Sequence, residues 1–185
     1  MTVERFPYRA KKWAIQQITK YTKRPDQHQR LNETDFDALV ILDACRWDVL
    51  NDVTEWPFGK ACSPGSQTAQ WLGVAEETGI FEGTHIVSGQ GQYERRSLGE
   101  ASIDKIWEDE YDQRLQTVLP TPVLERAEER LYAGDTPTVM HLIPPHAPYI
   151  AKVGDKWLLT EPSVNIWKRP NDGDADGTFM SPQVA

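Results

Sequence analysis

The chain has 185 residues, of which 39% are hydrophobic, and this is enough to build one domain with an apolar core. Its formal net charge of -8, from 28 acidic and 20 basic residues, argues against nucleic acid as a partner, because binding to a phosphate backbone depends on Lys and Arg. No segment approaches the roughly 18 apolar residues of a membrane-spanning helix, and charged residues stand where a secretion signal would be apolar. We therefore expect a cytoplasmic protein whose two cysteines, Cys45 and Cys62, are free thiols.

The first expected element is a basic amphipathic helix over residues 5–24. Apolar side chains such as Ala14, Ile15 and Ile18 share one face of it, and Pro25 ends it. Two interpretations remain open. The helix could make peripheral contact with an anionic membrane surface, or it could pack on the domain with its basic face in solvent.

Strands and helices alternate along the rest of the chain. The clearest strand is ALVILD, a continuous apolar run closed by an acid, which is typical of a strand buried in a parallel sheet. The expected elements are strands over 38–43, 84–88 and 138–143 and helices over 45–53, 66–79 and 122–132, with Gly79 as a C-terminal cap.

This order predicts an α/β fold with a parallel, doubly wound, three-layer αβα sheet, incomplete at its C-terminal side. We expect an N-terminal helix within residues 1–30, a partial α/β domain over 31–160 and an irregular tail over 161–185. Ligands of such sheets bind beyond the carboxyl ends of the strands. Candidate functional residues are therefore expected there.

The first candidate is Asp43, at the carboxyl end of the first expected strand. A carboxylate on this rigid position could coordinate a hard or borderline metal ion. Asp48, on the helix that follows, is a second acidic candidate. The alternative is that Asp43 caps the next helix and has no ligand.

The second candidate is the loop CSPGSQTAQWL, in which small and hydroxyl residues run straight into a helix. Backbone N–H groups at a helix start attract phosphate or sulfate, and a hydroxyl there becomes a nucleophile when a metal lowers its pKa. Ser66 and Thr68 are the residues that could act in this way. The alternative is that one of them only caps the helix.

The third candidate is His146 in VMHLIPPHAPYI, where a buried strand leads into a loop bracketed by prolines. The prolines restrict where this imidazole points, and we expect it in the ligand crevice, donating to an anionic oxygen. His141, inside the strand, is expected to be structural.

The blocks LVILDACRWDVL, SPGSQTAQWL, HIVSGQ and VMHLIPPHAPYI, in this order, resemble those of sulfatase-like hydrolases and transferases of the alkaline phosphatase superfamily. The resemblance covers about residues 36–160. It implies that Asp43 binds a divalent metal such as zinc, manganese or calcium. It also implies that Thr68 is both nucleophile and metal ligand, and that His146 and Ser66 contact a small anionic ester substrate.

True sulfatases carry a Cys-x-Pro-x-Arg motif, and here Ser66 stands where the arginine should be. The sulfatase motif is therefore broken, and the resemblance favours phosphate esters over sulfate esters. The family completes its metal site with a later Asp-His-Gly segment and a further histidine, whereas the four histidines here are His28, His85, His141 and His146. Metal binding is accordingly expected to be weak or absent.

Two functions from different classes follow. One is a truncated, impaired hydrolase or transferase that acts on phosphate esters through Thr68. The other is a catalytically inactive remnant of the same fold that binds an anion or a partner. A parallel sheet stopped after three strands would expose an edge, which a partner chain could complete.

Overall fold

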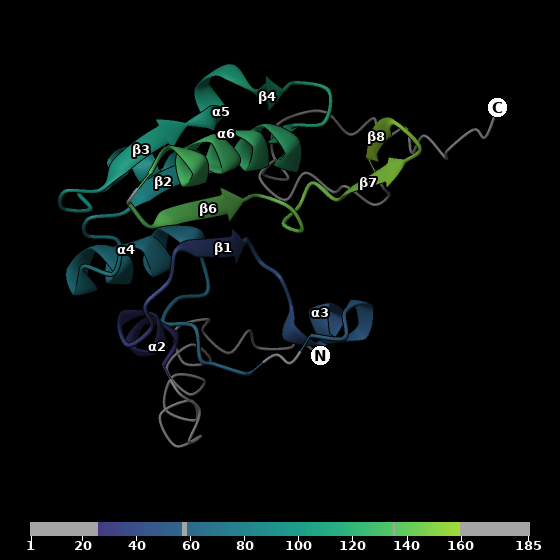
Figure 1. The fold of residues 1–185 in the computed structure, drawn as a ribbon. Helices are drawn as coiled ribbons and strands as arrows, with labels where there is room; N and C mark the ends of the chain where they lie inside the picture. Colours follow the sequence, from purple (N-terminus) through teal and green to yellow (C-terminus); the bar gives the residue numbers. More distant parts are fainter. Residues whose placement is uncertain (1–25, 57–58, 135, 160–185) are drawn as a thin grey trace, which may run out of the picture. The chain divides into compact units, whose positions relative to one another are not determined.

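The computed structural model describes residues 26–56, 59–134 and 136–159 (Figure 1). The expected helix over 5–24 and the expected tail over 161–185 lie outside these residues. Contacts divide the chain into two compact units. Among described residues the first unit comprises 26–35, 47–56, 59–82 and 96–99, and the second comprises 36–46, 83–95, 100–134 and 136–159.

The second unit contains a four-stranded parallel sheet, so the expected α/β character and parallel pairing are confirmed. The strand order is β1-β6-β2-β3. Strand β6 is central and all its residues are buried, whereas β1 lies at an edge and is partly exposed. The sequence predicts three strands, and β3 is the fourth. The strands are β1 (Ala38–Leu42), β2 (His85–Ser88), β3 (Ser102–Lys105) and β6 (Thr138–Leu142).

Helix α6 (Pro120–Ala133) packs along β6 and β2 (Figure 1). Its prolines stand in the first turn, where the missing N–H costs no helical hydrogen bond. Val123 and Ala127, four residues apart on one helix face, are buried against the sheet. They form an apolar core with four residues of the sheet and the chain before α6, namely Val87, Val118, Met140 and Leu142.

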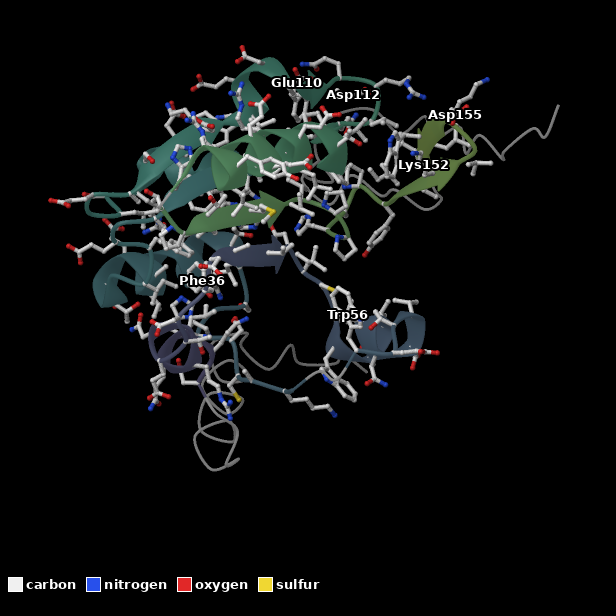
Figure 2. All side chains as sticks on the ribbon, viewed as in Figure 1. Phe36, Trp56, Glu110, Asp112, Lys152 and Asp155 are labelled. Carbon is white, nitrogen blue, oxygen red and sulfur yellow. The ribbon has the colours of Figure 1, made fainter. Side chains whose placement is uncertain are left out.

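Short elements complete the second unit. They are the 3-10 helix η1 (Gly91–Arg95), helix α5 (Ile106–Asp109), the pair β4 (Tyr111–Asp112) and β5 (Thr117–Val118), and the hairpin β7 (Ile150–Val153) and β8 (Lys156–Leu159). The hairpin turns at Gly154 and Asp155, and the φ of 59° at Gly154 favours glycine; Asp155 of the turn and Lys152 of β7 are labelled in Figure 2. Arg114 donates to the Trp157 carbonyl at 3.1 Å, which connects the two hairpins.

The first unit is built from α2 (Gln27–Asn32), α3 (Trp47–Val53) and α4 (Thr68–Thr78). His28 of α2 is buried against Trp71 of α4, with ring centroids 4.5 Å apart and the His28 Nε2 3.2 Å from the Trp71 carbonyl oxygen. Helix α4 ends at Gly79 in the left-handed conformation (φ 65°), as the sequence predicts. These contacts pack α2 onto α4.

Each helix and strand expected within the described residues is present, with bounds shifted by a few residues. Both Cys45 and Cys62 are free thiols, and burial raises the pKa of Cys45. Within residues 26–56, 59–134 and 136–159, no helix is long and apolar enough to cross a membrane.

Candidate functional site

Asp43 follows β1 directly and stands at the carboxyl end of the parallel sheet, where the sequence places it. Its backbone N–H donates to the Leu142 carbonyl at 3.0 Å and so extends the β1–β6 ladder by one residue. The chain then turns sharply, because the Cys45 N–H donates back to the Leu42 carbonyl at 3.3 Å. Within this turn Ala44 has a φ of 56°, a left-handed conformation that costs a non-glycine residue about 1–2 kcal/mol.

A glutamine from two strands away in the sheet holds the Asp43 carboxylate. Gln90, just beyond β2, donates from Nε2 to Asp43 Oδ2 at 3.0 Å. Gln90 is itself fixed, because its backbone N–H donates to the buried Ser88 hydroxyl at 2.9 Å. Gly89 lies between them and packs so closely that an added Cβ would stand 3.1 Å from the Val118 Cβ. The backbone that presents Gln90 is thus fixed on both sides.

His141 extends this cluster into the core. The imidazole is 1% exposed, and its Nε2 lies 3.8 Å from Asp43 Oδ2, which is beyond hydrogen-bond distance. On its other side Nδ1 lies 2.9 Å from the hydroxyl of Tyr93, which is fully buried, and the two rings meet edge to face at 5.4 Å. His141 is a buried strand residue, as expected. In addition, its ring lies between the Tyr93 hydroxyl and the Asp43 carboxylate.

Burial and, after it, the negative charge of Asp43 raise the pKa of Tyr93 far above its usual range. The hydroxyl therefore stays protonated at any physiological pH. Nothing in the sequence marked Tyr93 or Gln90, because their contacts are to residues more than forty positions away. Only the stretch HIVSGQ, already noted as a block, pointed to this segment.

His146 lies in the loop that follows β6, on the same edge of the sheet as Asp43. Its backbone N–H donates to the Ile143 carbonyl at 2.9 Å, and its Nδ1 lies 2.5 Å from the Ala147 carbonyl oxygen. Because a carbonyl only accepts, Nδ1 carries the proton in this contact. The expected donation to an anion would then come from Nε2, the other ring nitrogen.

Ser66 and Thr68 belong to the first unit. Thr68 is the first residue of α4, and the N-cap is Gln67, with no side-chain cap hydrogen bond, so neither hydroxyl residue occupies the cap position. The backbone N–H of Ser66 donates to Gln70 Oε1 at 3.2 Å and its hydroxyl lies 3.4 Å from the same oxygen. Asp48 lies in the first turn of α3. That Thr68 meets Asp43 at one site stays a prediction.

The described side chains around Asp43 are too few to hold a divalent metal. In the part of the chain that the structure describes, no three His, Cys, Asp or Glu side chains are grouped to hold a metal ion. Asp43 supplies one carboxylate, and His141 could add Nε2 only if that nitrogen carries no proton, whereas metals of this class take four or more ligands. The described residues alone therefore do not fit a resident metal.

A second polar cluster lies on β2, β3 and α6. Asp104 accepts two hydrogen bonds from Arg130, at 2.9 and 3.0 Å, and His85 Nε2 lies 3.3 Å from it. The Ser102 hydroxyl is 2.6 Å from Nδ1 of His85. Burial alone would raise the pKa of Asp104, but the contacts with Arg130 and His85 outweigh it and the pKa is lowered. Because Arg130 already takes both carboxylate oxygens, we interpret this cluster as a fastening between α6 and the edge strand.

Comparison with protein-family models, with curated proteins and with solved structures found no match for this chain.

Proposed function

We propose that the chain carries part of a phosphoester hydrolase or transferase site of the sulfatase-like type, at the carboxyl edge of the second unit's sheet. The observation that supports this most is the placement of Asp43. Its carboxylate follows a parallel strand directly, sits beside a left-handed turn and is held by Gln90. Strained backbone and a fixed carboxylate at this edge are both characteristic of functional sites in α/β sheets.

The four parallel strands would belong to a doubly wound, three-layer αβα sheet of the alkaline phosphatase type, with helices on both faces. The supporting features are the parallel pairing of β1, β6, β2 and β3 and the packing of α6 along β6 and β2.

In the proposed reaction the Thr68 hydroxyl gives up its proton and its oxygen attacks the phosphorus of an ester. The bond from phosphorus to the ester oxygen breaks, the alcohol leaves with a proton, and the phosphothreonine formed is passed to water or to an acceptor alcohol. Asp43 would contribute one carboxylate to a divalent cation, and His146, with Ser66, would contact the non-bridging oxygens. A divalent cation at such a site lowers the pKa of the attacking hydroxyl and neutralises the phosphate. The remaining ligands would come from residues outside the described ranges or from another chain.

The test is calorimetric titration of the full chain with zinc and with manganese, for the wild type and Asp43→Ala. Asp37→Ala is the matched control, because it removes an exposed carboxylate at the opposite end of the same strand. Because the described residues offer few ligands, we expect weak binding, which Asp43→Ala abolishes and Asp37→Ala preserves. Equal binding by all three chains would contradict the assignment of Asp43.

Turnover is tested separately with bis(p-nitrophenyl) phosphate and p-nitrophenyl sulfate, with and without glycerol as acceptor. Thr68→Ala should abolish phosphodiester cleavage, whereas Thr78→Ala, at the other end of α4, should preserve it. Cleavage that persists in Thr68→Ala would exclude the threonine nucleophile.

A second candidate function is anion or partner binding without turnover. The donor set favours it, because Asp43 and His141 do not by themselves fit a resident metal. Calorimetric titration with inorganic phosphate in the presence of a chelator separates the two functions. Phosphate binding in the chelated chain, together with no phosphodiester cleavage in added zinc or manganese, would favour this second function.

A further inference from the structure

His141 and Tyr93 form a buried link behind Asp43 that no part of the proposed reaction uses. His141 pairs in register with Ile41 of β1 and with Ser88 of β2, so it lies between the two strands whose ends carry Asp43 and Gln90. The backbone of His141 also contacts the segment after β2, since the Gly89 N–H donates to the His141 carbonyl at 3.1 Å. One residue of the central strand therefore contacts both segments.

The direction of the Tyr93–His141 hydrogen bond decides what His141 presents to Asp43. If Nδ1 carried the proton, the lone pair of Nε2 would face the Asp43 carboxylate across 3.8 Å, which is electrostatically unfavourable. If the Tyr93 hydroxyl donates instead, the proton stands on Nε2 and points toward the negative oxygen. The second arrangement places opposite partial charges together, and the protonated Tyr93 hydroxyl supplies the donor that it needs.

We propose that Tyr93 donates to Nδ1 of His141, which places the ring proton on Nε2, and that this N–H and the Gln90 amide together hold the Asp43 carboxylate in one orientation. His141 and Tyr93 are thus positioning residues, since they act through Asp43. Gln90 and His141 both approach Oδ2 of Asp43, Gln90 by a hydrogen bond of 3.0 Å and His141 by an electrostatic contact at 3.8 Å. Partners of this kind commonly orient a functional carboxylate or imidazole. The effect of this orientation on metal binding rests on the proposed function, but the proposed tautomer of His141 does not.

The tautomer is read directly from the histidine ring nitrogens by long-range proton–nitrogen NMR on the full chain in a chelating buffer. We expect His141 with a protonated Nε2 and a hydrogen-bonded, unprotonated Nδ1. In Tyr93→Phe the Nδ1 resonance should move toward the value of a nitrogen without a donor. A protonated Nδ1 in the wild type, or an unchanged Nδ1 in Tyr93→Phe, would overturn the proposal.

A matched pair of substitutions separates positioning from packing. In His141→Gln the side-chain amide reaches the place of Nε2 and keeps a donor toward Asp43, whereas in His141→Asn it reaches only the place of Nδ1. The readout is the side-chain amide resonance of Gln90, which reports its hydrogen bond to Asp43. We expect it to stay near the wild-type position in His141→Gln and to shift toward that of a free amide in His141→Asn. Equal shifts in both variants would mean that His141 only fills space.

Metal affinity gives the functional readout. If the wild type binds manganese, His141→Asn and Tyr93→Phe should weaken binding by about tenfold or more, and His141→Gln should preserve it. If the wild type binds no metal, the proposed function fails on its own, and the two NMR measurements still decide the tautomer and the positioning of Asp43.

Discussion

The turn after β1 can be tested by replacing Ala44 with glycine. Ala44 is exposed, so its methyl group contributes little by burial, and its φ of 56° costs an L-residue about 1–2 kcal/mol relative to glycine. Glycine has the opposing disadvantage of greater freedom in the unfolded chain, about 0.4–1 kcal/mol relative to alanine. We therefore expect Ala44→Gly to raise the free energy of unfolding by about 0.5–1 kcal/mol.

Ala38→Gly is the matched control. Ala38 is also exposed and lies in β1, only six positions earlier, where its backbone is extended. The unfolded-state term is common to both variants, but Ala38→Gly relieves no strain and should lower the free energy of unfolding by about 0.5–1 kcal/mol. The difference between the two variants thus isolates the left-handed strain, about 1–2 kcal/mol.

The assay is urea denaturation followed by tryptophan fluorescence, with both variants and the wild type measured side by side. Opposite signs for the two substitutions would support the strained turn beside Asp43. If both glycine variants lowered the free energy of unfolding by the same amount, Ala44 would not be in the left-handed conformation. Backbone strain at this turn would then no longer support a functional site at Asp43.

Three further predictions concern stability. Burial lowers the pKa of His28, so the neutral ring contributes to the free energy of unfolding at pH values above its unfolded pKa of about 6.5. This contribution is lost as the pH falls through the folded pKa. Denaturation at a series of pH values should show the loss in the wild type and not in His28→Gln. The lowered pKa of Asp104 likewise contributes stability above its unfolded pKa of about 4 that is lost at lower pH, and Asp104→Asn should flatten the stability profile in that acidic range. Gly79→Ala should cost about 1 kcal/mol because of its φ of 65°, since the nearest atom, 3.5 Å away, leaves room for the methyl group; a neutral result in urea denaturation would contradict the left-handed cap.

The sequence predicts the long, strongly patterned elements of the fold well. The apolar run ALVILD, the strand TVMHL and the helix capped by Gly79 are local signals, and the structure contains all three. Strand β3 was missed because SIDK is short, half charged and lies at a sheet edge, so it shows no apolar run. The hairpin β7–β8 was also missed, although Val-Gly-Asp-Lys between two apolar segments is a turn signal that could have indicated it.

The candidate site was predictable only in part. Asp43 and the His146 loop follow strand ends, and a strand end can be read from local sequence. The contacts of Asp43 with Gln90 and of His141 with Tyr93 depend instead on which strands become neighbours. The order of strands in a parallel sheet cannot be predicted from local sequence patterns. For the same reason the meeting of Thr68 with Asp43 remains a prediction.

The pairing of β1 with β6 also has a consequence for biosynthesis. Ala38 pairs with Thr138, so the two strands leave the ribosome 100 residues apart, roughly 5–20 s at ordinary rates of translation. During that interval the apolar segment ALVIL has been made but its partner has not, and it must stay solvated, find a transient contact or be held by a chaperone. The carboxylate of Asp43 acquires its surroundings only after Leu142 has been added, which makes this edge of the sheet one of the last parts of the described fold to form.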